Sequence, residues 1–152
     1  MIGMGKHGFK VSIYNYIENA CVADSIHFVS DKTLTDQTKT DTFVTEWISV
    51  NLGAFDVNSS PAEGTVKMYI LTRKDPEGLQ NSKLLDKVLS YFSDPTASDG
   101  NKRIPFRESN GVAMVDTGVM WLARVDIADD FFLQDETKVC PTNLVFSWVC
   151  SL

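Results

Sequence analysis

The fold is decided by residues 43–92, FVTEWISVNLGAFDVNSSPAEGTVKMYILTRKDPEGLQNSKLLDKVLSYF. Apolar and polar side chains alternate through Phe43–Gly53 and again through Thr65–Arg73, and a period of two is typical of β-strands. Between these runs, Asp56–Gly64 is rich in turn-forming residues. We therefore expect the two strands to pair as antiparallel neighbours.

The pattern becomes helical after this pair of strands. Leu85, Val88, Leu89 and Phe92 recur at i, i+3, i+4 and i+7, the spacing of one apolar face of an α-helix, while charged residues occupy the outer side. This spacing predicts an amphipathic helix over Leu79–Phe92.

Shorter patterns predict the remaining elements. Phe9, Ile13 and Ile17 fall at helical spacing, so residues 9–21 are expected to form an N-terminal helix, and the polar, Thr-rich residues 31–41 a loop. Five further strands are expected at Ile26–Val29, Arg103–Arg107, Val112–Val115, Val119–Ile127 and Leu144–Cys150. Together these elements predict one α+β domain over residues 1–152, a mostly antiparallel sheet with an N-terminal helix and one central amphipathic helix packed on it.

Three of these strands carry further information. Pro105 assigns residues 103–107 to a sheet edge, because proline cannot donate to the hydrogen-bond ladder. Alternation places the last strand's apolar face on Leu144, Phe146, Trp148 and Cys150. In the strand before it, alternation puts on one face Val119, Trp121, Ala123, Val125 and Ile127.

The net charge limits the classes of function that suit this chain. Fourteen basic and twenty acidic residues leave a charge of −6 at pH 7. A protein that wraps duplex DNA normally carries a basic footprint, so this charge weighs against a DNA-binding regulator. It does not weigh against a conduit for DNA, because like charge keeps the duplex from adhering to the surrounding wall.

Cysteine usage and hydropathy indicate the compartment. Cys21, Cys140 and Cys150 form an odd, widely spaced set, which favours buried free thiols over a disulfide framework or a zinc site. Lys6 and Lys10 precede an apolar stretch that polar residues interrupt, so no signal-peptide core is present, and no apolar run approaches membrane-spanning length. We expect a protein made in the cytosol without a membrane partner.

Few residues could carry catalysis. Neither His7 nor His27 lies beside a nucleophile motif such as G-x-S-x-G, and His27 in a short strand is more simply a surface residue. Residues 3–8, GMGKHG, match G-x-G-x-x-G literally, but no strand precedes them, so we expect a flexible N-terminus and not a phosphate-binding loop. We expect no catalytic residue, no metal ligand and no cofactor.

An acidic cluster is the strongest candidate for a cation site. Its members are Asp126, Asp129, Asp130, Asp135 and Glu136. Their spacing does not follow the EF-hand pattern and the glycine at the turn is missing, so a solvated acidic loop is favoured over a cation site.

Within the same loop, Phe131 and Phe132 are adjacent aromatic residues. Successive side chains of a strand point to opposite faces, so both cannot enter one core from a strand. Either one is exposed in the isolated chain and buried in an assembly, where aromatic residues are enriched, or a locally twisted loop buries both.

A basic counterpart to the acidic loop is formed by Lys102, Arg103 and Arg107. If the 126–136 loop of one copy met this basic group on the next, a head-to-tail contact would form, and such contacts can close into a ring. We treat all seven of these acidic, aromatic and basic positions (Lys102, Arg103, Arg107, Asp129, Asp130, Phe131 and Phe132) as candidate assembly contacts. Charge reversal at Arg103 and Arg107 is expected to break the oligomer.

The order of elements resembles that of the tail terminator family, the ring-forming proteins that cap the tail tube of long-tailed bacteriophages. The likeness is carried by the 9–21 helix, Glu46–Leu52 (EWISVNL), Gly64–Ile70 (GTVKMYI), the Leu79–Phe92 helix and the Leu144–Cys150 strand. Two segments, Thr33–Thr42 and Asp94–Asp116, depart from a minimal version of the pattern.

The resemblance implies a structural virion protein without catalytic residues. It implies a homohexameric ring at the tail or neck, assembled in the host cytoplasm, which contacts the tail tube protein and the head connector protein while DNA passes through its lumen without specific binding. The alternatives are another neck or connector protein, a tail tube subunit, or a small-molecule-binding or hydrolytic α+β domain that uses His27 and the acids of residues 126–136.

Overall fold

The computed structural model describes residues 5–31, 44–59 and 61–150. These residues form one sheet of seven strands and two helices. The elements in chain order are α1 (Lys6–Ala23), β1 (His27–Ser30), β2 (Glu46–Asp56), β3 (Ala62–Thr72), α3 (Leu79–Ser90), β4 (Ile104–Ser109), β5 (Met114–Ile127), β6 (Phe131–Phe132) and β7 (Lys138–Cys150). The predicted α+β class, with an N-terminal helix and a central helix, is confirmed.

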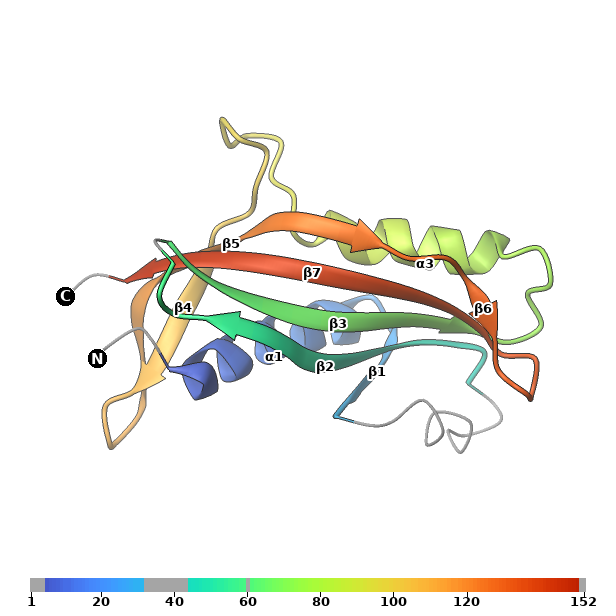
Figure 1. Ribbon diagram of the computed structural model, residues 1–152, viewed down its shortest axis with the longest axis horizontal. Helices are drawn as coiled ribbons and strands as arrows, with labels where there is room; N and C mark the ends of the chain where they lie inside the picture. Colours follow the sequence, from blue (N-terminus) through green and yellow to red (C-terminus); the bar gives the residue numbers. More distant parts are fainter. Residues whose placement is uncertain (1–4, 32–43, 60, 151–152) are drawn as a thin grey trace.

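The strands lie in the order β1-β2-β3-β7-β5-β4, and β6 also pairs with β7 (Figure 1). Every pairing is antiparallel except that of β1 with β2, which is parallel. The expected pairing of β2 with β3 is confirmed, with Trp47 opposite Leu71 and Val50 opposite Met68. β4 ends the sheet, as Pro105 predicted.

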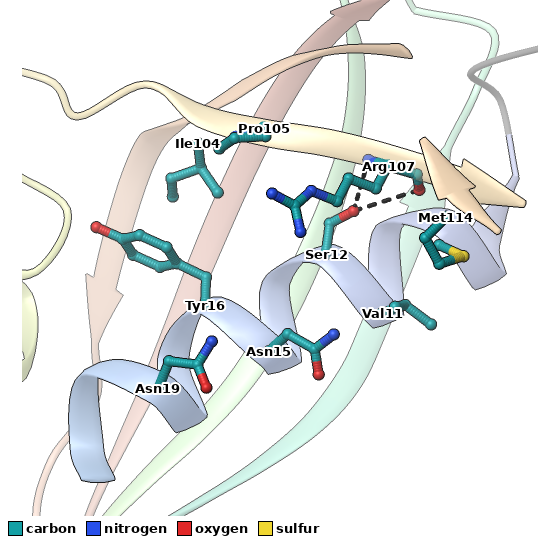
Figure 2. Close-up of a pocket in the computed structure, with 9 residues that line it drawn as sticks. All are labelled: Val11, Ser12, Asn15, Tyr16, Asn19, Ile104, Pro105, Arg107 and Met114. Atoms are coloured by element: carbon teal, nitrogen blue, oxygen red, sulfur yellow. Dashed lines mark hydrogen bonds between the residues drawn. The ribbon is translucent and has the colours of Figure 1, made fainter. Parts of the chain in front are cut away.

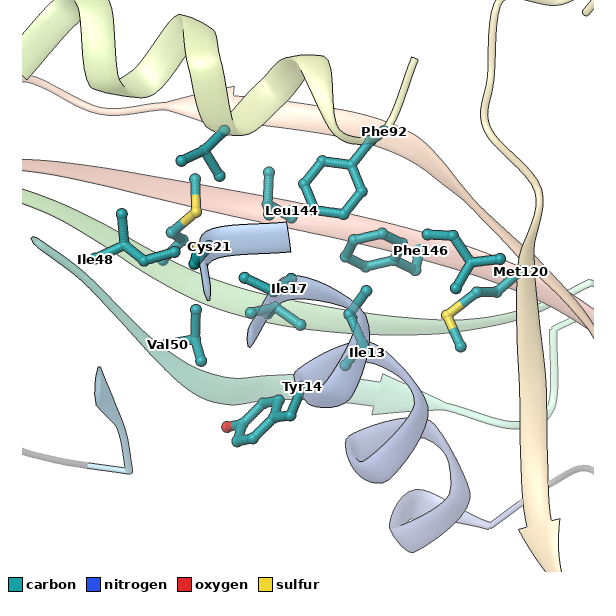
Figure 3. Packing of buried hydrophobic residues seen from close by; sticks show 14 of the residues in the cluster. Ile13, Tyr14, Ile17, Cys21, Ile48, Val50, Phe92, Met120, Leu144 and Phe146 are labelled. Carbon is teal, nitrogen blue, oxygen red and sulfur yellow. The ribbon is translucent and has the colours of Figure 1, made fainter. Parts of the chain in front are cut away.

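Both helices pack on one face of the sheet, where they enclose the main core (Figure 3). From α1, Phe9, Ile13 and Ile17 are completely buried, and α3 adds Leu84 and Val88. The helical periodicity therefore predicted correctly which face of each helix packs on the sheet. The predicted inner face of β7 is confirmed, with Leu144, Phe146 and Trp148 in the core and Cys150 packed against it.

Aromatic rings fix the orientation of α1 across the core. The ring of Trp148 stacks on Phe9 and on Phe106, with centroids 5.0 and 5.2 Å apart. Such stacked pairs contribute about 0.5–1.5 kcal/mol each beyond the area that they bury. Because these residues come from α1, β4 and β7, the stacked rings hold the N-terminal helix against the sheet near its β4 edge.

The sheet curls so that both of its edges reach α1. At β4, the backbone N–H of Arg107 donates to the Ser12 hydroxyl, 2.8 Å away. Beside β1, the Tyr14 hydroxyl donates to Asp31 at 3.0 Å. Gly8 permits the close approach to β4, since a Cβ atom there would lie 2.8 Å from the Arg107 carbonyl oxygen.

Gly8 also corrects a prediction. The glycines of residues 3–8 were expected to form a flexible N-terminus, but α1 begins at Lys6, Gly5 is its N-cap residue and Gly8 lies inside it. The physical reason is packing, because a helix without a side chain at position 8 can press against the edge strand. Residues 1–4, and all but Asp31 of the predicted 31–41 loop, lie outside the described residues.

Strand β5 departs from the prediction in two ways. One continuous strand replaces the two expected at residues 112–115 and 119–127, and Val112 lies in the turn before it. The alternating residues from Val119 to Ile127 were also predicted to share one face along the whole strand, but in its first part Met120 is completely buried whereas Trp121 is half-buried. A bulge between Leu122 and Arg124 then shifts the alternation, so that Val125 packs on the core.

The opposite face of the sheet carries a small second cluster. Trp47, Leu71 and Val139 are completely buried there, and Leu133 packs against them from the segment after β6. The β6 region is therefore fastened to the sheet by this cluster.

All three cysteines are free thiols. Burial raises the pKa of Cys21 to about 12 and that of Cys140 to about 11, so both stay protonated near neutral pH. Cys150 is only half-buried, which departs from the expectation of three buried thiols. In the parts of the chain that the structure describes, no helix combines the length and the apolar character needed to cross a membrane.

Candidate functional site

The first candidate surface is the aromatic end, which we define as Ile127, Phe131 and Phe132. Phe131 pairs with Val139 and Phe132 with Lys138, so the two rings point to opposite faces of β6. Both rings are exposed, by 37% and 53%, and Ile127 is 55% exposed. The structure therefore leaves both aromatic residues exposed, whereas the sequence suggested that one of them or neither would be exposed.

Phe132 lines an open groove of about 600 Å³, which we call the terminal groove. Its walls are the β3–α3 connection, residues 73–76, and the β6–β7 connection at Asp135 and Glu136. Lys138 lies over the Phe132 ring, with its ammonium group 4.7 Å from the ring centroid and 3.7 Å from the Asp130 carboxylate. The groove thus has an aromatic wall and a rim of mixed charge, because Arg73 and Lys74 line it together with the acidic residues.

The wall of the terminal groove is held by Asp75. Its carboxylate accepts hydrogen bonds from the backbone N–H groups of Asn81 (2.9 Å) and Gln80 (3.2 Å) and from the Thr72 hydroxyl (3.0 Å). Partial burial opposes ionisation of Asp75, but these donors outweigh it and lower the pKa of the carboxyl group. The charged side chain therefore caps the start of α3.

The acidic residues of the predicted loop divide into two sets. Asp126 pairs with Arg124 at 3.1 Å and Asp130 with Lys138 at 3.7 Å. The second set forms no ion pair with any residue that the structure describes and consists of Asp129, Asp135 and Glu136. Within the described ranges, no three His, Cys, Asp or Glu side chains are grouped closely enough to hold a metal ion.

The second candidate surface is the tip of the β4–β5 hairpin, which we define as Val112, Met114 and Val115. Val112 is 95% exposed, and the other two are 38% exposed each. The Asn110 side chain accepts the backbone N–H groups of Val112 and Ala113, at 3.0 and 2.9 Å, and so fixes the turn. A strand was expected to begin at Val112, but this residue lies in the turn, and the strand begins at Met114.

Two residues of the predicted basic group form ion pairs with carboxylates of the same chain. Arg103 pairs with Asp99 at 2.7 Å and lies over the Trp121 ring, 5.1 Å from its centroid. Arg107 pairs with Asp116 at 2.8 Å instead. Lys102 is exposed next to Arg103 at the start of β4.

Arg107 belongs to a different setting, a small groove between α1 and β4 (Figure 2). This groove has a volume of about 140 Å³, and polar residues of α1, among them Ser12, Asn15 and Asn19, line one side of it. Figure 2 shows the Ser12 hydroxyl directed at the backbone of Arg107, with which it exchanges hydrogen bonds. The helix thereby covers the edge of β4, so this edge is less open to strand pairing than a bare edge strand.

The aromatic end and the hairpin tip lie at opposite ends of the molecule (Figure 1). Phe132 pairs with Lys138 at the start of β7, whereas Gly118 pairs with Cys150 at its end. The thirteen residues of β7 span about 40 Å at 3.3 Å per residue, and the hairpin continues beyond that. Two uncovered apolar surfaces therefore face away from each other along the long axis.

His27 is remote from the acidic loop. The register places His27, Trp47, Leu71, Val139 and Phe131 in one row across the sheet. Four strand spacings of about 4.8 Å separate the ends of this row, roughly 19 Å. His27 and the 126–136 acids therefore do not meet at one reacting atom, which removes the geometric basis for a hydrolytic site built from them.

Comparison with known proteins adds information about the fold alone. No protein-family model and no curated protein matches the chain. One solved structure, of a protein whose name states no function, superposes with a TM-score of 0.56 at 9% sequence identity and covers 99% of both chains. The α+β arrangement is thus shared over its whole length with a protein of very different sequence.

Proposed function

We propose that this protein is a structural subunit of a bacteriophage tail or neck, of the tail terminator kind. In this role it would form a ring, which we expect to be hexameric, at the end of the tail tube. The ring would contact the tail tube protein on one face and the head connector protein on the other. It would act by shape and would not catalyse a reaction.

The observation that carries the proposal is the pair of uncovered apolar surfaces at opposite ends of the chain. Val112 is 95% exposed at one end, and Phe132 is 53% exposed at the other. Large exposed apolar side chains gathered at one place are typical of interaction surfaces. Two different surfaces on opposite ends suit a head-to-tail contact, which closes into a ring when the rotation per copy permits.

The arrangement of elements supports the same proposal. The chain runs N-terminal helix, strands, central helix and further strands, which is the order that the resemblance to tail terminators rests on. The net charge of −6 suits a lumen through which DNA slides, because like charge limits adhesion. The protein would then be assembled in the host cytoplasm and remain in the virion.

Electron cryomicroscopy of the purified protein tests the proposal. Closed rings are the expected particles, and adding them to growing tail tubes of the cognate phage should stop elongation. Open tubes would instead indicate a tail tube subunit. Single chains at every concentration would contradict the proposal.

A further inference from the structure

The part of β5 that follows Met120 is an open edge of the sheet. β4 pairs with β5 only as far as Met120, and β7 pairs with the other side of the strand. No backbone hydrogen bond from any described segment other than β7 reaches Trp121–Ile127. Figure 1 shows this part of β5 as the upper border of the sheet. Such an edge presents backbone N–H and C=O groups that can pair with a further strand.

Side chains along this edge are exposed as well. They include Ala123 and Ile127, and the Ile127 side chain is 55% exposed. Arg124 and Asp126 pair with each other at 3.1 Å, and their side chains are 63% and 54% exposed. An ion pair this exposed contributes little to stability, so both charges can also interact with a partner.

We propose that two copies of the chain pair along this edge in an antiparallel, two-fold dimer centred on Val125. In this register Val125 lies opposite Val125 of the second copy, and Arg124 of each chain lies opposite Asp126 of the other. The sheet then continues from one copy into the second. The partner is a second copy of this chain, and the inference goes beyond the proposed function without resting on it.

Charge decides both the direction and the register of this pairing. A parallel pairing in register would set Arg124 against Arg124 and Asp126 against Asp126. An antiparallel pairing centred on either of these residues would set that residue against its own copy. Only the register centred on Val125 places opposite charges directly across from each other, twice. Opposite charges across a strand pair are stabilising, whereas like charges are destabilising.

The apolar residues of the edge agree with the same register. Val125 pairs with Leu144 on the β7 side, and its side chain packs on the main core. Ile127 lies on the same face as Val125, because alternate residues of a strand share a face. In the dimer, Ile127 of one copy would lie across from the bulge of the other, beside Leu122 and Ala123. Its exposed apolar side chain would thereby be covered.

The symmetry of this contact separates it from the proposed ring. A two-fold contact closes at two copies, whereas a ring needs a head-to-tail contact that continues from copy to copy. The edge pairing therefore joins free chains in solution. Because the paired stretch, residues 123–127, is short, we expect the dimer to depend on concentration.

A charge-exchange experiment tests the inference. Arg124→Asp gives a chain with two carboxylates on the edge, and Asp126→Arg gives one with two guanidinium groups. Each variant alone should dimerise about 10-fold more weakly or worse, because both attractive pairs become repulsive. Mixed together, the variants should form a one-to-one heterodimer, because every pair across the edge again has opposite charges. The ion pair within the chain stays broken in both variants, so recovery in the mixture cannot come from it.

The matched control is Lys6→Asp, which makes the same change of charge as Arg124→Asp at an exposed residue at the start of α1. It should dimerise like the wild type when measured by native mass spectrometry. Wild-type dimerisation of both edge variants, or a mixture that stays monomeric while the wild type dimerises, would overturn the inference and leave the proposed function standing. A wild-type protein that forms closed rings but no dimer would do the same, whereas one that is monomeric at every concentration would overturn both.

Discussion

Asn81 lies where the central helix meets the ends of β3 and β7, and only 2% of its surface is exposed. Its side-chain amide donates to the Ile70 carbonyl at 3.0 Å and to the Thr72 hydroxyl at 3.2 Å. A weaker bond, at 3.4 Å, reaches the Lys138 carbonyl. One buried side chain therefore ties α3 to two neighbouring strands next to the terminal groove.

Replacing Asn81 with alanine is expected to lower the free energy of unfolding by about 1–3 kcal/mol, because buried acceptors lose their donor. Urea titration followed by circular dichroism measures the change. Asn143→Ala is the control, since Asn143 is exposed on β7 and should lose less than about 0.5 kcal/mol. Equal losses in the two variants would show that the Asn81 hydrogen bonds contribute nothing.

Asp75 makes stability depend on pH. The donors around it lower the pKa of its carboxyl group in the folded state despite partial burial. Its stabilising contribution is therefore present above the carboxyl pKa of the unfolded chain, about 3.9, and is lost as the pH falls through the lower folded-state pKa. Asp75→Asn should cost stability at pH 7 and progressively less on acidification. Urea titrations of both proteins at several pH values measure this difference; a gap that stays constant down to pH 2 would contradict the assignment.

These residue-scale roles could not be predicted from the sequence. Helical periodicity places Leu85 and Val88 toward the sheet, and Asn81 lies on the same side one turn earlier. Its partners come from residues 11 and 57 positions away, so they depend on how the strands meet. Likewise, the exposure of Val112 follows from a turn that Asn110 fixes, whereas its apolar character alone suggested a strand.

At the scale of elements, α1 and β4 are in unusually close contact at Gly8. A Cβ atom at this position would lie 2.8 Å from the Arg107 carbonyl oxygen and equally close to Glu108. The backbone oxygen cannot move without shifting β4. The helix therefore covers the strand edge only as long as position 8 has no side chain.

Gly8→Ala is expected to destabilise the protein by about 1–3 kcal/mol through overpacking, although alanine has the better helix propensity. Thermal and urea unfolding measure the effect. The control is Gly5→Ser, which also adds a Cβ atom but at a place where the nearest atom would be 3.8 Å away. If Gly8→Ala were as stable as the wild type, α1 would have to sit further from β4 than described.

Most elements follow from local periodicity, but their irregularities do not. The strands of residues 46–56 and 62–72 and the helix at Leu79 were evident because their patterns are long and regular. The bulge between Leu122 and Arg124 reversed the inner face of β5, and alternation alone gives no sign of a bulge. The parallel pairing of β1 is also a tertiary outcome, since a four-residue strand has no pattern that fixes its direction.

For the whole molecule, the fold class could be read from the sequence because two strands, a helix and further strands leave few compact arrangements. The candidate assembly contacts stay a prediction. The aromatic pair Phe131 and Phe132 is exposed as an interaction surface would require. Among the basic residues, Arg103 and Arg107 each pair with a nearby carboxylate, which offsets their charge.

Self-assembly is the central claim, and native mass spectrometry of the purified wild-type protein over a range of concentrations tests it most directly. The account predicts a closed species of six copies, with six times the chain mass of 16.9 kDa. The fraction of the protein in this species should increase as the concentration rises. A stable monomer at all concentrations would contradict it.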